Sequence, residues 1–272
     1  MIIIFESYRV LSLILTKMSF LNKVVIVTGA GSGIGEAISY HFAKYAARLS
    51  LVDKDADNLK KTAEECERLS RAKVLTTVAD LRNDQNVLKV VTNTKNEFGR
   101  IDVVINCAGI YKPASILDPN LIEVYDDVMT TNLRSIVYLT NCVTSELAET
   151  KGNIINISST ACSLGASKSV PYQTSVAALD HFTTCAAVDL AVKGVRVNSI
   201  SPGVVKTKIL DNAGVDPEES EAFWNGASSV PLSRLVKTED VAEFAVFLAS
   251  DKAKAMTGCS YSIDAGLALA LP

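Results

Sequence analysis

The stretch TGAGSGIG, Thr28 to Gly35, follows directly on the apolar run Val24-Val25-Ile26-Val27 and decides the fold. A β-strand that ends in clustered glycines and then opens a helix is typical of a dinucleotide site. The glycines let the backbone approach a pyrophosphate, and the helix N-terminus supplies unpaired N–H groups. The alternative is an ordinary glycine-rich turn, but a helix over Ile34–Ala46 and a strand over Arg48–Asp53 are predicted to follow. We therefore expect cofactor contacts from Gly29, Ser32, Gly33, Ile34 and Gly35.

The second predicted strand ends on a carboxylate. Asp53 lies 18 residues after Gly35, close to where an acidic side chain meets the adenosine ribose in such sites. A carboxylate there accepts hydrogen bonds from the ribose 2′-OH and repels a 2′-phosphate. The alternative is that Asp53 caps the helix predicted to begin near Asp55.

Composition excludes several classes of protein. The 272 residues are 48% hydrophobic, enough for one core, and the scattered charges with a net charge of −3 give no basic stripe for nucleic acid. The six cysteines show no CxxC spacing, which favours reduced thiols in the cytoplasm. The two histidines lie inside predicted helices, no metal site can be assembled, and the GxSxG motif of serine hydrolases is absent.

Residues 1–17 differ from the rest of the chain. They are apolar, but Glu6, Arg9 and Lys17 interrupt them, so no uncharged run is long enough to span a bilayer. They also lack the basic start and cleavage site of a signal peptide. We interpret them as a dispensable extension of a domain over residues 18–272, the alternative being a loose membrane-surface anchor.

Strand-like and helix-like segments alternate along that domain. Continuous Val/Ile runs are typical of a parallel sheet covered on both faces, so we predict a single α/β domain, a doubly wound Rossmann fold with its ligand at the carboxyl ends of the strands. The further strands are predicted over Lys73–Ala79, Ile101–Asn106, Asn153–Ser158, Val195–Ile200 and Ser260–Ile263. The further helices are predicted over Asp84–Phe98, Leu121–Glu149, Pro171–Val192 and Glu239–Ala249, with a long irregular segment before the last.

The motifs at those carboxyl ends resemble the short-chain dehydrogenase/reductase family over Met18–Gly266. The family's TGxxxGxG stands as TGAGSGIG, its NNAG as Asn106-Cys107-Ala108-Gly109, and its PG motif as Pro202-Gly203 in SPGVVKT. The C-terminal TGCSYSIDAG is also similar. The resemblance implies further cofactor contacts from Asp80 and Leu81 beside adenine, from Asn106, Ala108 and Gly109 near the adenosine ribose, and from Tyr172, Pro202, Gly203, Val205 and Thr207 on the nicotinamide side.

The same resemblance implies a catalytic set. The family's helix Asn matches Asn132 in TTNLRS, and its catalytic Ser matches Ser159 in INISST, thirteen residues before Tyr172. Alone, Ser159 and Tyr172 are unremarkable, and the spacing between them makes them a pair. Asn132 has the alternative of being a polar residue in a long helix with no chemical role.

The family's YxxxK motif is broken here, because the chain reads Tyr172-Gln-Thr-Ser-Val176. In relatives the lysine holds the nicotinamide ribose and lowers the pKa of the tyrosine. Without a cation almost none of a phenol is ionised at neutral pH, and losing general acid–base assistance typically costs about 10²–10⁴-fold in rate. The loss should affect alcohol oxidation more than carbonyl reduction. Lys168 and Lys206 lie near the site in sequence, but neither is expected on the face where the ribose binds.

For the cofactor we predict NAD, with NADP as the less favoured alternative. Asp53 and Ser32 favour NAD, whereas Lys54 is a residue type that NADP-preferring relatives often carry at that position.

For the activity we predict an oxidoreductase of hydroxyl/carbonyl pairs acting on a small, lipophilic substrate such as a steroid, retinoid or isoprenoid. The segment Val204–Val230, where the family builds its substrate lid, carries Ile209, Leu210, Phe223 and Trp224, although these side chains could equally pack the lid onto the domain. The alternative, prompted by Val176, is a cofactor-binding pseudoenzyme that acts as a sensor or scaffold. The resemblance also implies a homotetramer or homodimer.

Overall fold

The computed structural model describes residues 20–70, 73–163, 165–227 and 230–270. The apolar extension over residues 1–17 lies outside these ranges. No helix in the described ranges is long and apolar enough to cross a membrane.

Seven strands form one parallel sheet in the order β3-β2-β1-β4-β5-β6-β7. The order reverses between β1 and β4, and in doubly wound sheets ligands bind at the carboxyl ends of the strands beside this point. The strands are β1 Val24–Thr28, β2 Arg48–Asp53, β3 Val74–Val78, β4 Val103–Asn106, β5 Asn153–Ile157, β6 Arg196–Pro202 and β7 Ser260–Ile263.

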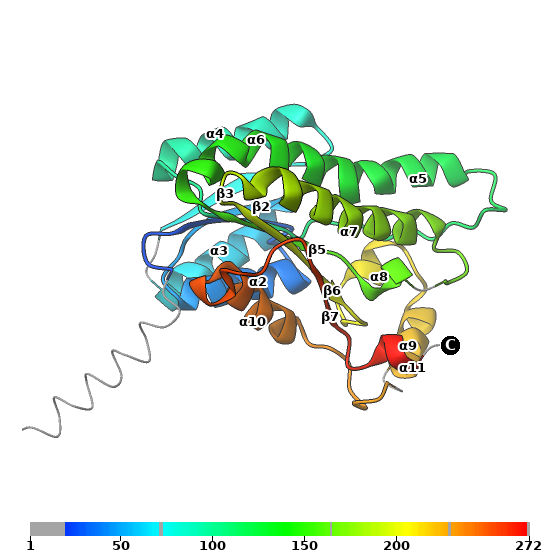
Figure 1. Ribbon diagram of the computed structural model, residues 1–272. Coiled ribbons are helices and arrows are strands. Elements are labelled where there is room, and N and C mark those ends of the chain that lie inside the picture. The colour runs from blue at the N-terminus through cyan, green and yellow to red at the C-terminus, as the bar shows by residue number, and fades with distance from the viewer. Residues whose placement is uncertain (1–19, 71–72, 164, 228–229, 271–272) are drawn as a thin grey trace, which may run out of the picture.

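Helices cover both faces of the sheet (Figure 1), which explains the unbroken apolar strands. On the first face lie α2 Gly33–Lys44, α3 Ala56–Ser70 and α10 Thr238–Ala249; on the second lie α4 Asp84–Phe98, α5 Leu121–Met129, α6 Ser135–Thr150 and α7 Val170–Ala191. Val25 and Val27 pack in the core under α2, α3 and α10, whereas Ile26 between them packs in the core under α4, α6 and α7. The Rossmann fold predicted from the sequence is confirmed.

The predicted helix over Leu121–Glu149 is wrong in one respect. A π-helical turn, η2 Thr130–Arg134, separates α5 from α6. The turn inserts an extra residue into the helix at the position of Asn132, whose side chain bonds to the backbone of Ile110.

The segment predicted as long and irregular contains two helices, α8 Ile209–Asn212 and α9 Pro217–Ala227. The missed signal lies just before α9, where Asp216 Oδ1 accepts a hydrogen bond from Glu218 N at 2.8 Å, as an N-capping carboxylate does. Short turns η3 Thr160–Ser163 and η4 Asp251–Ala253 and the terminal helix α11 Leu267–Ala270 complete the described elements.

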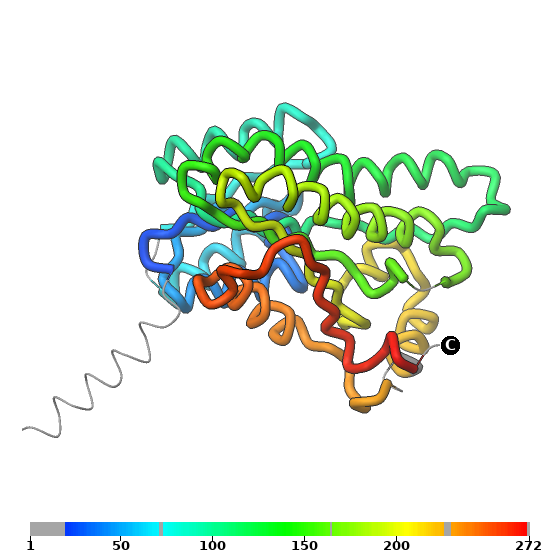
Figure 2. Tube along the Cα trace, viewed as in Figure 1, coloured from blue at the N-terminus to red at the C-terminus, as the bar shows by residue number. Residues whose placement is uncertain are grey.

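The chain after β7 returns to the segment between β6 and α10 (Figure 2). Leu232 N donates to Ala265 O at 3.1 Å, and a Cβ on Gly266 would lie 2.9 Å from the ring of Pro231. The segment between β6 and α10 is therefore held, at Pro231 and Leu232, against the chain that follows β7.

Candidate active site

The glycine loop is packed too tightly for side chains. Gly29 has a φ of +66°, and a Cβ on it would lie 2.9 Å from the backbone of Ala108. A Cβ on Gly35 would lie 2.1 Å from the carbonyl oxygen of Gly29. The first turn of α2 therefore presents bare backbone at the carboxyl end of β1, and the N–H groups of a helix's first turn have no partner within the helix. This cradle suits a pyrophosphate.

The Asp53 carboxylate is tied to this loop. Asp53 Oδ2 accepts a hydrogen bond from Gly31 N at 2.9 Å, and Oδ1 accepts one from Asp55 N at 3.0 Å. Asp55, whose Oδ1 accepts from Asn58 N, is the residue that caps α3. Asp53 thus keeps acceptor capacity beside the glycine loop.

Thr28 joins the first and fourth strands. Its hydroxyl donates to Ile105 O and accepts from Cys107 N at 3.0 Å and from Ala108 N at 3.1 Å. This positions the NCAG segment, including Gly109, beside the glycine loop. Within the sheet, Asn106 Nδ2 donates to Asn156 Oδ1 at 2.8 Å.

The segment after β6 reaches the same edge. Thr160 Oγ1 donates to Pro202 O, and Val205 pairs with Val236. A Cβ on Gly33 would lie 3.1 Å from the Thr207 methyl group, so Thr207 covers the start of α2. A Cβ on Gly203 would lie 2.8 Å from Asp264, so this close approach requires glycine.

Asp80 follows β3, the strand next to β2, and Ala79 N just before it donates to Asp53 O at 2.8 Å. Its carboxylate pairs with Arg82, which also pairs with Asp127 at 2.7 Å. The Arg82 hydrogen bond is the main cause that holds the Asp80 pKa below its usual value. Arg82 was not predicted from the sequence. Leu81, which lies between Asp80 and Arg82, is buried.

The hydroxyls of Ser159 and Tyr172 lie within hydrogen-bond reach of each other. Burial raises the pKa of the Tyr172 phenol above its ordinary 10.0, and the Ser159 hydrogen bond opposes this in part. Tyr111, Cys107 and Cys162 raise it further. Burial also raises the pKa of the Cys107 thiol to about 12 and that of Cys162 to about 11, so both stay protonated.

Asn132 is buried and holds three partners. Its Oδ1 accepts from Ile110 N at 2.8 Å, and its Nδ2 donates to Ile110 O at 2.9 Å and to Ser175 Oγ at 3.1 Å. Ser175 Oγ in turn donates to Tyr172 O at 2.7 Å. Ser175 was missed in the sequence, although it lies three residues after Tyr172 on the same helix face.

Val176 is 4% exposed, and its carbonyl oxygen accepts a hydrogen bond from Ser158 Oγ. The two lysines near the site in sequence are engaged elsewhere or exposed. Lys206 pairs with Glu221 at 3.0 Å, toward α9, and Lys168 is an exposed residue of the loop before α7.

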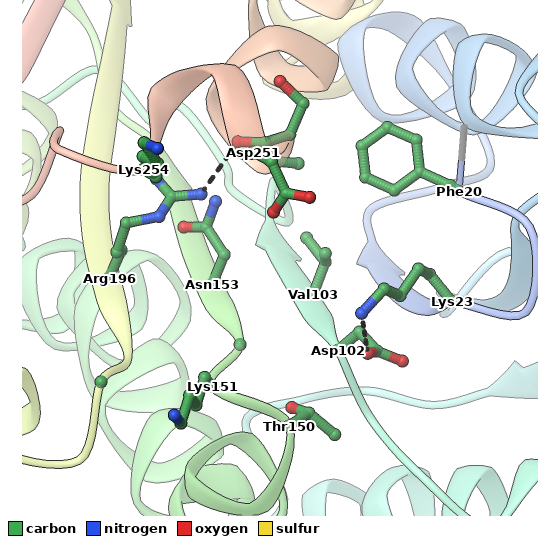
Figure 3. Close-up of a pocket in the computed structure, with 14 residues that line it drawn as sticks. Phe20, Lys23, Asp102, Val103, Thr150, Lys151, Asn153, Arg196, Asp251 and Lys254 are labelled. Atoms are coloured by element: carbon green, nitrogen blue, oxygen red, sulfur yellow. Dashed lines mark hydrogen bonds and ion pairs between the residues drawn. The ribbon is translucent and has the colours of Figure 1, made fainter. Parts of the chain in front are cut away.

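A cavity of about 280 Å³ lies at the opposite, amino-terminal edge of the sheet and contains none of the predicted site residues. It is lined by residues at the starts of β1, β4, β5 and β6. Figure 3 shows Lys23 beside Asp102 at one side of the cavity, where the two form an ion pair of 3.0 Å. The converging motifs at the carboxyl edge, rather than this cavity, make the candidate active site.

Three comparisons with known proteins agree with this geometry. A family model described as enoyl-(acyl carrier protein) reductase matches residues 29–268. L-fucose dehydrogenase from Bos taurus is 33% identical over 251 residues, covering 92% of this chain and 91% of the relative. A Caenorhabditis elegans short-chain dehydrogenase/reductase of unknown function, solved with cofactor, is 31% identical with a TM-score of 0.87, covering 93% and 97% of the two chains. A 7α-hydroxysteroid dehydrogenase solved with NADH and a 7-oxo bile acid is 27% identical with a TM-score of 0.85, covering 92% and 96%.

The chain belongs to the short-chain dehydrogenase/reductase family. As a member it is a short-chain alcohol dehydrogenase/ketoreductase, an oxidoreductase of hydroxyl and carbonyl groups, and the family binds nicotinamide cofactors. The residues present fit such a cofactor, because the tight glycine cradle, Asp53 and the Thr207 segment meet at one edge of the sheet.

Proposed function

We propose that this family member is an NADH-dependent reductase of small lipophilic carbonyl compounds, with Tyr172 as proton donor and Ser159 as the residue that holds the carbonyl oxygen. One observation carries the proposal. Tyr172 is half-buried, with its phenol next to Ser159 and apolar Val176 one helical turn away, and desolvation raises the pKa of the phenol, so it stays protonated at neutral pH.

A protonated phenol can do one half of the family reaction well. When bound, the reduced nicotinamide supplies a hydride to the carbonyl carbon. The Tyr172 O–H then gives its proton to the carbonyl oxygen, and the Ser159 hydroxyl polarises that oxygen by a hydrogen bond. The product is an alcohol. The reverse reaction needs the phenolate, which burial disfavours and no lysine at position 176 supports.

Asp53 is the residue that we propose to select NADH. Its two oxygens accept backbone N–H groups beside the glycine loop, where a carboxylate would repel a 2′-phosphate. Asp53 Oδ2 accepts from Gly31 N at 2.9 Å, whereas the neighbouring carboxylate of Asp80 is paired with Arg82, which leaves Asp53 as the carboxylate bonded to the loop backbone.

The lid supports a lipophilic substrate. Phe223 is 50% exposed on α9, while its edge-to-face neighbour Trp224 is buried. Ile209 and Leu210 on α8 are half-buried at the same edge. Among relatives, the names point to a sugar in one case and to a steroid in another; the apolar lid favours the second class here.

Val176 favours a second candidate function, a cofactor-binding pseudoenzyme. If the missing lysine removes turnover in both directions, the cofactor cradle would remain as a sensor of the NADH pool.

A panel of lipophilic ketones and alcohols, assayed with NADH, NADPH and their oxidised forms, separates the two. Ketone reduction with NADH that Tyr172→Phe abolishes would support the reductase. Micromolar NADH binding without turnover of any compound would favour the pseudoenzyme. As a matched control, Tyr125→Phe on α5 should leave activity unchanged.

A further inference from the structure

The loop after the NCAG segment is pinned at both ends. At its start, the Asn132 side chain bonds both the N–H and the C=O of Ile110, at 2.8 and 2.9 Å. At its end, Ala114 N donates to Lys168 O at 2.9 Å and Val170 N donates to Ala114 O at 3.3 Å, at the beginning of α7. The loop between these points has little freedom to move relative to α7.

Tyr111 lies between the two anchors and faces Tyr172. The two rings meet edge to face, with centroids 5.5 Å apart and an interplanar angle of 81°. The hydroxyls of Tyr111 and Ser169 lie 3.3 Å apart, which attaches the far end of the Tyr111 ring to the turn before α7. Edge-to-face pairs of this kind contribute about 0.5–1.5 kcal/mol beyond the area they bury.

We propose that Tyr111 is a positioning residue for Tyr172, which fixes the orientation of the phenol ring toward Ser159 and keeps water from its hydroxyl. The inference rests on the proposed function. This positioning matters because the apolar side chain of Val176 offers the Tyr172 hydroxyl neither a hydrogen bond nor a charge. Orientation is a large part of catalysis, and a displacement of about 1 Å can cost about 10²-fold in rate.

Two substitutions at position 111 test the role of the ring. Tyr111→Ala removes the ring and should lower kcat for ketone reduction at least tenfold. Tyr111→Phe keeps the ring and loses only the Ser169 contact, and it should stay within about threefold of the wild type.

The pKa of Tyr172 gives a readout that a merely structural role would not move. Burial raises this pKa, and Tyr111 raises it further, so opening the site by Tyr111→Ala should lower it toward the ordinary value. Alkaline titration of the tyrosinate absorbance measures it without any substrate, when the curve of the same protein carrying Tyr172→Phe in addition is subtracted from each variant's curve. Tyr111→Phe should leave it closer to the wild type than Tyr111→Ala does.

Tyr45→Ala is the matched control, because Tyr45 also makes an edge-to-face contact, with Phe20, at the other edge of the sheet. It should lower stability without changing the Tyr172 titration. Where Tyr111→Ala does not fold, Tyr111→Leu keeps apolar volume without the aromatic edge and takes its place.

An unchanged Tyr172 pKa and kcat in the ring-less variant, or equal effects of Phe and Ala, would overturn the role of Tyr111. A wild type that reduces no ketone would instead overturn the proposed function. The substrate-free titration would still decide on Tyr111, so the two failures are distinguishable.

Discussion

At the scale of single residues, Val176 stands where the resemblance to the family predicts a lysine. The sequence was sufficient to find this position, because Tyr172 and Ser159 are recognisable by their spacing. The sequence did not show what surrounds the phenol. Tyr111 and Ser175 contact Tyr172 through a loop and a helix face, and their residue types and positions carry no motif that marks the contact.

The pH dependence of reduction follows from the raised pKa of Tyr172. In the reaction that we propose the phenol donates the proton, and since desolvation raises its pKa above the ordinary 10.0, it stays protonated until the pH rises past that value. The rate of ketone reduction should therefore show no alkaline decline due to Tyr172 below that pH. Alcohol oxidation needs the phenolate, and its rate should rise about tenfold per pH unit over the same range. An alkaline limb of reduction near neutrality that Tyr172→Phe removes would contradict this assignment.

We propose that Asp53 sets the cofactor preference. We expect NADH to bind at least tenfold tighter than NADPH, and Asp53→Ala to narrow the difference, since the charge that repels a 2′-phosphate is lost. Titration calorimetry with both cofactors measures this. Asp57→Ala removes a nearby exposed carboxylate on α3 and should leave the preference unchanged. Equal affinities in the wild type would refute the role of Asp53.

At the scale of elements, the sequence predicted whether a segment is a helix or a strand better than it predicted where a helix is interrupted. The bounds of β2, α4 and β7 agree residue by residue, because apolar runs and helix caps mark them locally, as with Asn83 Oδ1 accepting from Gln85 N before α4. The π turn at Asn132 is set by a partner 22 residues away, Ile110, and no local pattern announces such a contact. Helices α8 and α9 were not predicted, because their polar residues resemble those of a loop.

The π turn yields a stability prediction. Asn132→Ala removes three buried hydrogen bonds and leaves both backbone groups of Ile110 without them, which should cost about 2–4 kcal/mol in the free energy of unfolding. Chemical denaturation measures the loss. Asn141→Ala, an exposed position on α6, is the control and should change stability by less than about 0.5 kcal/mol. Similar stabilities of the two variants would show that Asn132 does not hold the turn.

At the scale of the whole molecule, the sequence predicted the sheet because of continuous apolar runs such as Val24–Val27 in β1, and only a sheet covered on both faces buries such a run. Assembly stays a prediction. Val188 on α7 and Val192 directly after it are 70% and 85% exposed, as expected for a face that another copy covers.

We expect a homotetramer or homodimer that uses this face of α7. Val188→Asp should break the interface, because a buried carboxylate without a partner is costly. Light scattering at micromolar concentration should then give a lower mass than for the wild type. Leu88→Asp on α4, 40% exposed, should leave the mass unchanged. A monomeric wild type would end this proposal.

The ratio of oxidative to reductive rates in Val176→Lys tests the central claim most directly, namely that the absence of a cation beside Tyr172 biases this site toward reduction. Lysine at position 176 places a charge one helical turn from the phenol, and this should lower the pKa of Tyr172 and speed alcohol oxidation. Val176→Met, similar in length but uncharged, is the matched control for the buried site. We predict that oxidation gains at least tenfold over reduction at neutral pH in Val176→Lys and not in Val176→Met. A folded Val176→Lys enzyme with the wild-type ratio would contradict the account.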